Sequence, residues 1–195
     1  MEQNPPPPGW YPSASGPLFT ERSLVFHQPA GILVHHSFSI LDGTGRLVGT
    51  VEGVGGGPYR RAVSHRIELR SATGELVLTI VAVPWKFESY RIEWPSLGSV
   101  GEIRAKLFGP KFVFFSNHQR IGLIRRTSWC DFTVEDEVGR RIAGINYSRL
   151  SSHIMALPES HTTLEREHPL TQPMSSLVLA SGVIVNKLAT RRKPV

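Results

Sequence analysis

The chain has 195 residues, 40% of them hydrophobic, which is enough for one compact domain with a sizeable core. Its single cysteine, Cys130, excludes an internal disulfide and a multi-cysteine zinc site, so we expect a reducing compartment. The formal net charge is +6. The start MEQNPPPP lacks the basic and apolar regions of a signal peptide, so we expect neither secretion nor a conventional membrane span.

Residues 1–20 are predicted to form a disordered, proline-rich head. Four consecutive prolines followed by GWYPSASGP favour extended polyproline conformation over helix or sheet. Pro5–Pro12 resembles a short N-terminal motif, usually PPGWYPDP, of many actinobacterial membrane-associated proteins, although Ser13 replaces its aspartate. We interpret the head either as a linker or as a contact for a protein partner.

One pattern then recurs three times, in Phe38–Thr50, Ile67–Thr79 and Phe132–Gly144. Each copy is an alternating strand, a turn that contains a glycine, and a second strand that opens with a charged residue. The glycine supplies the φ > 0 position that a short hairpin turn requires. Strands joined in this way are antiparallel neighbours, so the three copies predict a meander of hairpins.

Further strands are predicted at 23–28, 76–84, 90–94, 100–106, 111–115, 119–127 and 141–147. The total of about eleven or twelve strands, with turns at regular spacing, is typical of a sandwich or barrel. By contrast, residues 151–172 are predicted to be a polar, irregular connection to the last element.

That last element is a helix, predicted over Ser175–Ala189. Its apolar residues point all round the cylinder: Leu177, Val178, Leu179, Val183, Ile184, Val185 and Leu188. At about 1.5 Å per residue the helix reaches about 22 Å, well short of the ~30 Å hydrocarbon core of a bilayer. We therefore predict a central core helix, for which the strands supply a closed shell.

The positive charge is unevenly distributed. Up to Gly98 there are eight basic and eight acidic residues, whereas the rest of the chain has fourteen basic and eight acidic ones. Such a basic surface attracts phosphates of lipid or nucleic acid, and the alternative is a solvated, solubilising face. The candidates for anionic head-group contacts are Arg104, Lys106, Lys111, Arg125 and Arg126, and residues 191–195 form a basic tail.

Motifs for metal binding or catalysis are weak. His161 and His168 lie near Glu165 and Glu167, but we interpret them as solvated loop histidines rather than metal ligands. There is no nucleophile elbow, and Cys130 is predicted to be a small buried hydrophobe in a strand. We expect no enzyme activity, no cofactor and no metal. Nucleic-acid binding ranks below lipid binding because no known nucleic-acid motif is present.

The order of these motifs resembles the phospholipid scramblase and LURP-one-related branch of the tubby C-terminal-like superfamily, over roughly 18–189. The segments that carry the resemblance, besides the three hairpins, are Leu24–Gln28, Val100–Ile103, Ile121–Ile124 and His168–Leu170. The resemblance implies a closed antiparallel β-barrel around the C-terminal helix, as a single domain over 21–190. It also implies phospholipid binding, and the N-terminal motif at Pro5–Pro12 indicates a bacterial, actinobacterial-type member.

Two departures from the scramblases bear on activity. The palmitoylated cysteine cluster is missing, and Pro158–Glu167 lacks the alternating oxygen ligands of the family's calcium-binding segment. We therefore expect a non-enzymatic protein, peripheral at the inner, cytoplasmic face of the cell membrane, that binds anionic phospholipid. Transbilayer scrambling is implied by the resemblance alone. The alternative is a soluble interaction or regulatory domain without lipid activity.

Overall fold

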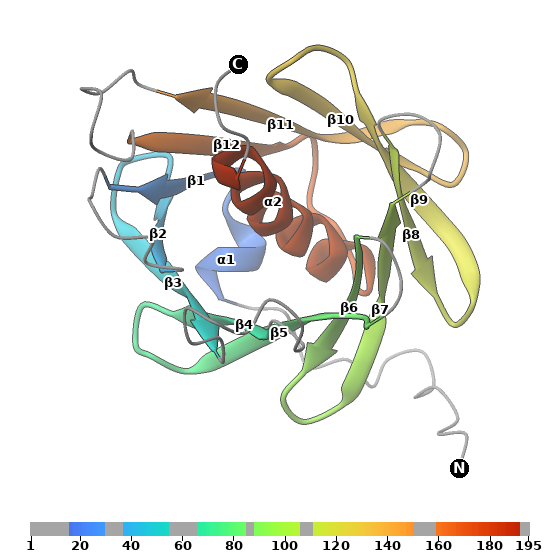
Figure 1. The fold of residues 1–195 in the computed structure, drawn as a ribbon, viewed down its shortest axis with the longest axis horizontal. Helices are drawn as coiled ribbons and strands as arrows, with labels where there is room; N and C mark the ends of the chain where they lie inside the picture. The colour runs from blue at the N-terminus through green and yellow to red at the C-terminus, as the bar shows by residue number, and fades with distance from the viewer. Residues whose placement is uncertain are drawn as a thin grey trace.

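Twelve antiparallel strands close into a barrel around one long helix (Figure 1). The computed structural model describes residues 16–29, 37–54, 66–84, 88–105, 111–149 and 159–191. The strands are β1 (Ser23–Gln28), β2 (Phe38–Asp42), β3 (Leu47–Val54), β4 (Arg66–Ser71), β5 (Leu76–Ala82), β6 (Ser89–Trp94), β7 (Gly98–Ala105), β8 (Lys111–Ser116), β9 (Gln119–Arg126), β10 (Asp131–Asp136), β11 (Arg141–Arg149) and β12 (Ser160–Arg166). The helices are α1 (Pro17–Thr20) and α2 (Met174–Arg191). The predicted closed antiparallel barrel is confirmed.

The barrel is a meander in which each strand pairs with the next one along the chain. The ring closes where the first strand, β1, pairs with the last, β12, with Leu24 opposite Leu164 and His27 opposite His161. Along β1, the buried Leu24 and Phe26 alternate with residues of the outer wall. This period of two lets a strand give one face to the core and the other to solvent.

Strand β12 corrects the prediction that residues 151–172 form an irregular connection. Within Ser160–Arg166 the buried residues are Ser160, Thr162, Leu164 and Arg166, which face inward at the spacing of a strand. Three of these four are polar, so the segment shows no apolar alternation in the sequence. Without this strand, the barrel would have a gap between β11 and β1.

Helix α1 moves the start of the folded domain upstream of the predicted boundary at residue 20. Its Leu18 and Phe19 are buried, and the Phe19 ring stacks on Trp94 with 5.7 Å between centroids. The buried guanidinium of Arg166 donates hydrogen bonds to the carbonyl oxygens of Leu18 and Glu21, which holds the α1 segment against the barrel. The rest of the predicted head, residues 1–15, and most of the basic tail, 192–195, lie outside the described residues.

Helix α2 fills the interior, as predicted, and it extends slightly beyond Ser175–Ala189 at both ends. The residues from Leu177 to Val185 with apolar side chains have at most 2% of their surface exposed, and Leu188 is partly buried against the same core. Gly182 faces Phe26 so closely that an added Cβ would lie 2.5 Å from the ring. The helix, which is apolar on every side, is thus enclosed by apolar side chains of its own barrel.

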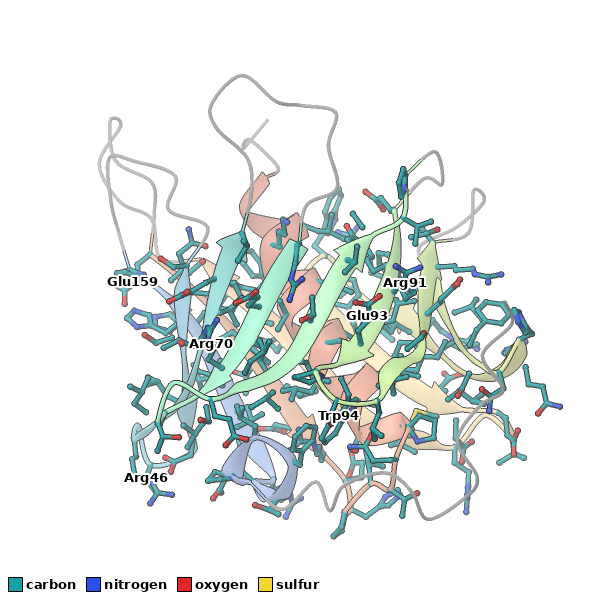
Figure 2. The ribbon with its side chains drawn as sticks, turned by 90° about the horizontal axis from the view of Figure 1, so that it is seen from below. Arg46, Arg70, Arg91, Glu93, Trp94 and Glu159 are labelled. Atoms are coloured by element: carbon teal, nitrogen blue, oxygen red, sulfur yellow. The ribbon has the colours of Figure 1, made fainter. Side chains whose placement is uncertain are left out.

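The barrel has two unlike ends. Short turns join β2 to β3, β4 to β5, β6 to β7, β8 to β9 and β10 to β11 at the short-turn end, and the other connections between strands lie at the long-loop end. Ser176 accepts a hydrogen bond from the Trp94 indole at the short-turn end (3.0 Å), and Asn186 accepts one from Thr162 near the other end (2.8 Å). Helix α2 therefore runs from the short-turn end to the long-loop end, where Glu159 also lies (Figure 2).

Among the described residues, no helix is both long enough and apolar enough to cross a membrane.

Candidate functional site

Most of the basic residues that were predicted to contact head groups lie on three adjacent strands at the long-loop end. Arg104 lies next to the last residue of β7, Lys111 is the first residue of β8, and Arg125 and Arg126 end β9. Lys111 is directly opposite Arg125 in the ladder between β8 and β9. Lys106 lies outside the described residues. Residues that are distant in the sequence thus share one sector of the barrel's long-loop end.

Two of these arginines are paired with carboxylates on the outer wall. The Arg104 guanidinium donates to Glu102, two residues earlier on the same strand, and lies 4.5 Å from the centroid of the Phe115 ring. Arg125 forms an ion pair with Glu135 on β10, with 3.1 Å between nitrogen and oxygen. Half-exposed pairs of this kind leave less free positive charge than a count along the sequence indicates.

Arg126 is held differently, by the loop that follows it. Its Nε donates to the Ser128 carbonyl oxygen (2.8 Å), and one terminal nitrogen donates to the Trp129 carbonyl oxygen (3.0 Å). The guanidinium carbon lies 4.6 Å from the centroid of the Trp129 ring, which is the geometry of a cation–π contact. The Trp129 side chain is 83% exposed, the largest value among the exposed large hydrophobic residues of the described chain.

Asp131 fixes the shape of this β9–β10 loop. Its carboxylate accepts hydrogen bonds from the Ser128 hydroxyl and the Asn146 amide, and these two bonds lower the pKa of Asp131. The Ser128 hydroxyl oxygen in turn accepts from the backbone N–H groups of Cys130 and Asp131. The exposed indole of Trp129 is therefore presented by an ordered turn.

Cys130 belongs to the same loop, and the structure corrects its predicted role. The thiol is free and exposed, not buried in a strand, because β10 begins one residue later at Asp131. Trp129 was not among the residues that were predicted to contact a ligand. The signal that marks Trp129 is local: it lies between Ser128 and Cys130 in the turn region just before β10.

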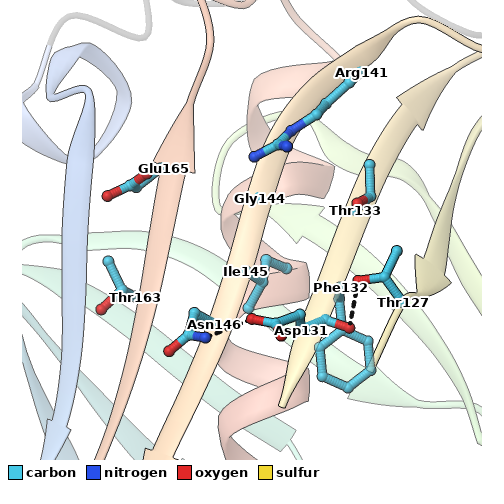
Figure 3. Close-up of a pocket in the computed structure, with 10 residues that line it drawn as sticks. All are labelled: Thr127, Asp131, Phe132, Thr133, Arg141, Gly144, Ile145, Asn146, Thr163 and Glu165. Atoms are coloured by element: carbon cyan, nitrogen blue, oxygen red, sulfur yellow. Dashed lines mark hydrogen bonds between the residues drawn. The ribbon is translucent and has the colours of Figure 1, made fainter. Parts of the chain in front are cut away.

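A shallow pocket of about 490 Å³ lies on the outer wall beside this loop (Figure 3). It is lined by Thr127, Asp131, Phe132, Thr133, Arg141, Gly144, Ile145, Asn146, Thr163 and Glu165. Figure 3 shows the Asn146 amide directed at Asp131 and the Arg141 side chain lying along Gly144. Arg141 also pairs with Glu167 at 3.0 Å. Asp131 and Arg141 thus already have partners, and the pocket is a polar groove between strands.

The two histidines that the sequence placed in one loop are separated by the fold. His161 lies on the outer wall in β12 at the long-loop end, and His168 lies beyond the other end of β12. The prediction that His161 lies in a loop is therefore wrong, since the residue belongs to β12, and its side chain is 29% exposed and stacks on His27.

No protein-family model matches this chain. No curated protein matches it either. The solved structures include an X-ray structure of a protein from Arabidopsis thaliana that is similar with a TM-score of 0.53 and 15% sequence identity. The similarity covers 90% of this chain and 96% of the plant protein. At this identity, the comparison supports a common barrel fold.

Proposed function

We propose that this protein is a non-enzymatic, scramblase-like or LURP-one-like barrel that binds anionic phospholipid at the inner face of the cell membrane. The proposal rests on the order of the family-like motifs, on the barrel around an apolar helix, and on the excess of basic residues after Gly98. The long-loop end is the surface that we expect to face the lipid.

The observation that carries the proposal is the contact between Arg126 and Trp129 at that end. Tryptophan favours the interface between water and lipid, because its ring is apolar and its N–H group is polar. Arginine pairs with phosphate, and a basic residue near an anionic surface contributes about 1 kcal/mol. An 83% exposed indole that lies under a guanidinium therefore combines both kinds of membrane contact in one ordered loop.

Further basic residues lie at the same end of the barrel. Arg104, Lys111 and Arg125 lie on the neighbouring strands, and helix α2 ends at the same end of the barrel with Arg191. Where glutamates pair with Arg104 and Arg125, an anionic head group must compete with them. We therefore expect modest, salt-sensitive attraction, with Arg126 and Trp129 contributing most of the affinity.

Peripheral binding fits the core better than insertion of α2 into the bilayer. The apolar side chains from Leu177 to Val185 are already enclosed by the strands. Moving α2 into lipid would expose the inner faces of the strands to water and remove the main core. Lipid scrambling is therefore not part of the proposed activity.

Sedimentation with vesicles across a salt series tests the proposal. We expect the wild type to bind vesicles that contain phosphatidylserine, to release them as salt rises, and to ignore neutral phosphatidylcholine vesicles. Trp129→Ala combined with Arg126→Ala should weaken binding by about tenfold or more, as expected for the loss of an interfacial ring and one charge.

The matched control removes one apolar side chain and one arginine at the short-turn end. Val138 is 70% exposed and Arg140 is paired with Asp136, so Val138→Ala with Arg140→Ala removes one apolar side chain and one charge there. This control should bind as the wild type does. Equal binding to neutral and anionic vesicles, or no binding to either, would reject the proposal and favour the alternative of a soluble interaction domain.

A further inference from the structure

Three potential metal ligands meet at the seam that closes the barrel. His27 of β1 and His161 of β12 are direct partners across the ladder, and their rings are stacked with 4.8 Å between centroids and 8° between planes. Glu159, the residue before β12, directs one carboxylate oxygen at both rings. That oxygen, Oε1, lies 2.9 Å from His27 Nε2 and 3.1 Å from His161 Nε2.

The backbone holds this arrangement in place. The neighbours of the two histidines, Phe26 and Thr162, are fully buried, so the alternation of each strand fixes both imidazoles on the outer wall. The side chains of His27 and His161 are 28% and 29% exposed, and Glu159 is 38% exposed. The site is thus partly desolvated but open to an ion from solvent.

The donor set indicates which ions fit. The three ligand atoms lie within 4.8 Å of one another, and two are imidazole nitrogens that converge on one carboxylate oxygen. Two histidines and one glutamate suit Zn²⁺ and similar divalent transition metals, which bind imidazole at about 2.0–2.1 Å and accept water as a fourth ligand. Ca²⁺ and Mg²⁺ prefer sets of oxygen ligands and fit poorly.

We propose that His27, Glu159 and His161 bind one divalent transition metal ion of the zinc type, which joins the first strand of the barrel to the last. The site is independent of the lipid contact proposed above, since it shares no residue with it. Because the ion binds side chains that only the folded barrel brings together, it should stabilise the folded state.

Titration calorimetry on the untagged full-length chain, with ZnCl₂ and with CaCl₂, tests the site. We expect one saturable zinc site per chain, no calcium binding at it, and a melting temperature that rises with the zinc concentration. His27→Ala, His161→Ala and Glu159→Gln should each weaken the site by at least about tenfold. The matched controls are His118→Ala and His168→Ala, which remove exposed histidines elsewhere and should leave it unchanged.

Glu159→Gln keeps the test decisive if a histidine variant unfolds. Glu159 precedes the strand and its side chain is partly exposed, so glutamine fits the same space with a much weaker ligand. The absence of saturable zinc binding to the wild type would overturn the proposal, as would unchanged binding in Glu159→Gln. The latter result would show that the cluster is held by hydrogen bonds alone and that zinc binds other histidines.

Discussion

At the scale of single residues, one aspartate in the β2–β3 turn shows how a short sequence pattern acts. Oδ1 of Asp42 accepts hydrogen bonds from the Thr44 hydroxyl (2.6 Å), the Thr44 N–H (2.9 Å) and the Arg46 N–H (3.0 Å), and Oδ2 accepts from the Arg46 side chain. These bonds, above all that from the Thr44 hydroxyl, lower the pKa of Asp42 from 3.8 to about 2. Asp136 binds Val138 and Arg140 in the same way in the β10–β11 turn.

The lowered pKa of Asp42 predicts how stability depends on pH. Since the folded pKa lies below the ordinary value of 3.8, the ionised carboxylate stabilises the fold above about pH 4, and this contribution is lost as the pH falls towards 2. Asp42→Asn should lower stability at pH 7 and flatten its dependence on pH between about 4 and 2. Urea unfolding at a series of pH values measures this, with the exposed Glu137→Gln as control. An unchanged pH slope in Asp42→Asn would contradict the assignment.

Individual arginines also show why a count of charges along the sequence overestimates the free positive charge. Arg104 and Arg125 were predicted as candidates for head-group contacts, and the structure pairs them with Glu102 and Glu135. The first partner is visible in the sequence, because residues two apart share one face of a strand. The second is not, since Arg125 and Glu135 come together only when β9 pairs with β10.

At the scale of elements, α2 was predictable and β12 was not. Leu177–Val185 is apolar on every side, so no arrangement other than enclosure suits it in water, and the sequence alone predicts a surrounding shell. The hairpins were equally clear, since Gly45, Gly74 and Gly139 have φ of +86°, +84° and +85° in their turns.

The difficulty with β12 is that its inward side chains find their partners far away in the sequence. Thr162 donates to Asn186 of α2, and Arg166 donates to carbonyl oxygens of the α1 segment. Burial lowers the pKa of Arg166 to about 10. Polar residues become acceptable in a core only when such partners exist, and a local pattern cannot supply them. The same long-range pairing brings His27 and His161 together.

Val183 tests the central position of α2. Its side chain is fully buried, so Val183→Asp places a charge in the apolar interior and should lower the free energy of unfolding by several kcal/mol, about 3 or more. Thermal melting and urea titration measure the loss. The matched control is Val138→Asp, where the side chain is 70% exposed and the same change should be nearly neutral. A Val183→Asp variant that melts with the wild type would show that α2 does not form the core.

At the scale of the whole molecule, the two ends of the barrel carry different features. The short-turn end carries α1, whose Leu18 and Phe19 belong to the core, and the buried Arg166, which holds α1 against the barrel. The long-loop end carries the ordered loop with Trp129, the neighbouring basic residues and the His27–His161 pair. We infer that the short-turn end mainly holds the fold together and that the long-loop end carries both proposed binding sites.

The orientation of the barrel on a membrane is the most direct test of this division. Cys130 is the sole cysteine of the chain, is exposed, and lies beside Trp129, so a polarity-sensitive fluorophore on its thiol reports from the long-loop end. The comparison is a Cys130→Ser, Val138→Cys variant, whose label reports from the short-turn end. With vesicles that contain phosphatidylserine, the label at 130 should shift to the blue and brighten, and the label at 138 should stay unchanged. A response at 138 alone, or at neither position, would contradict binding through the long-loop end.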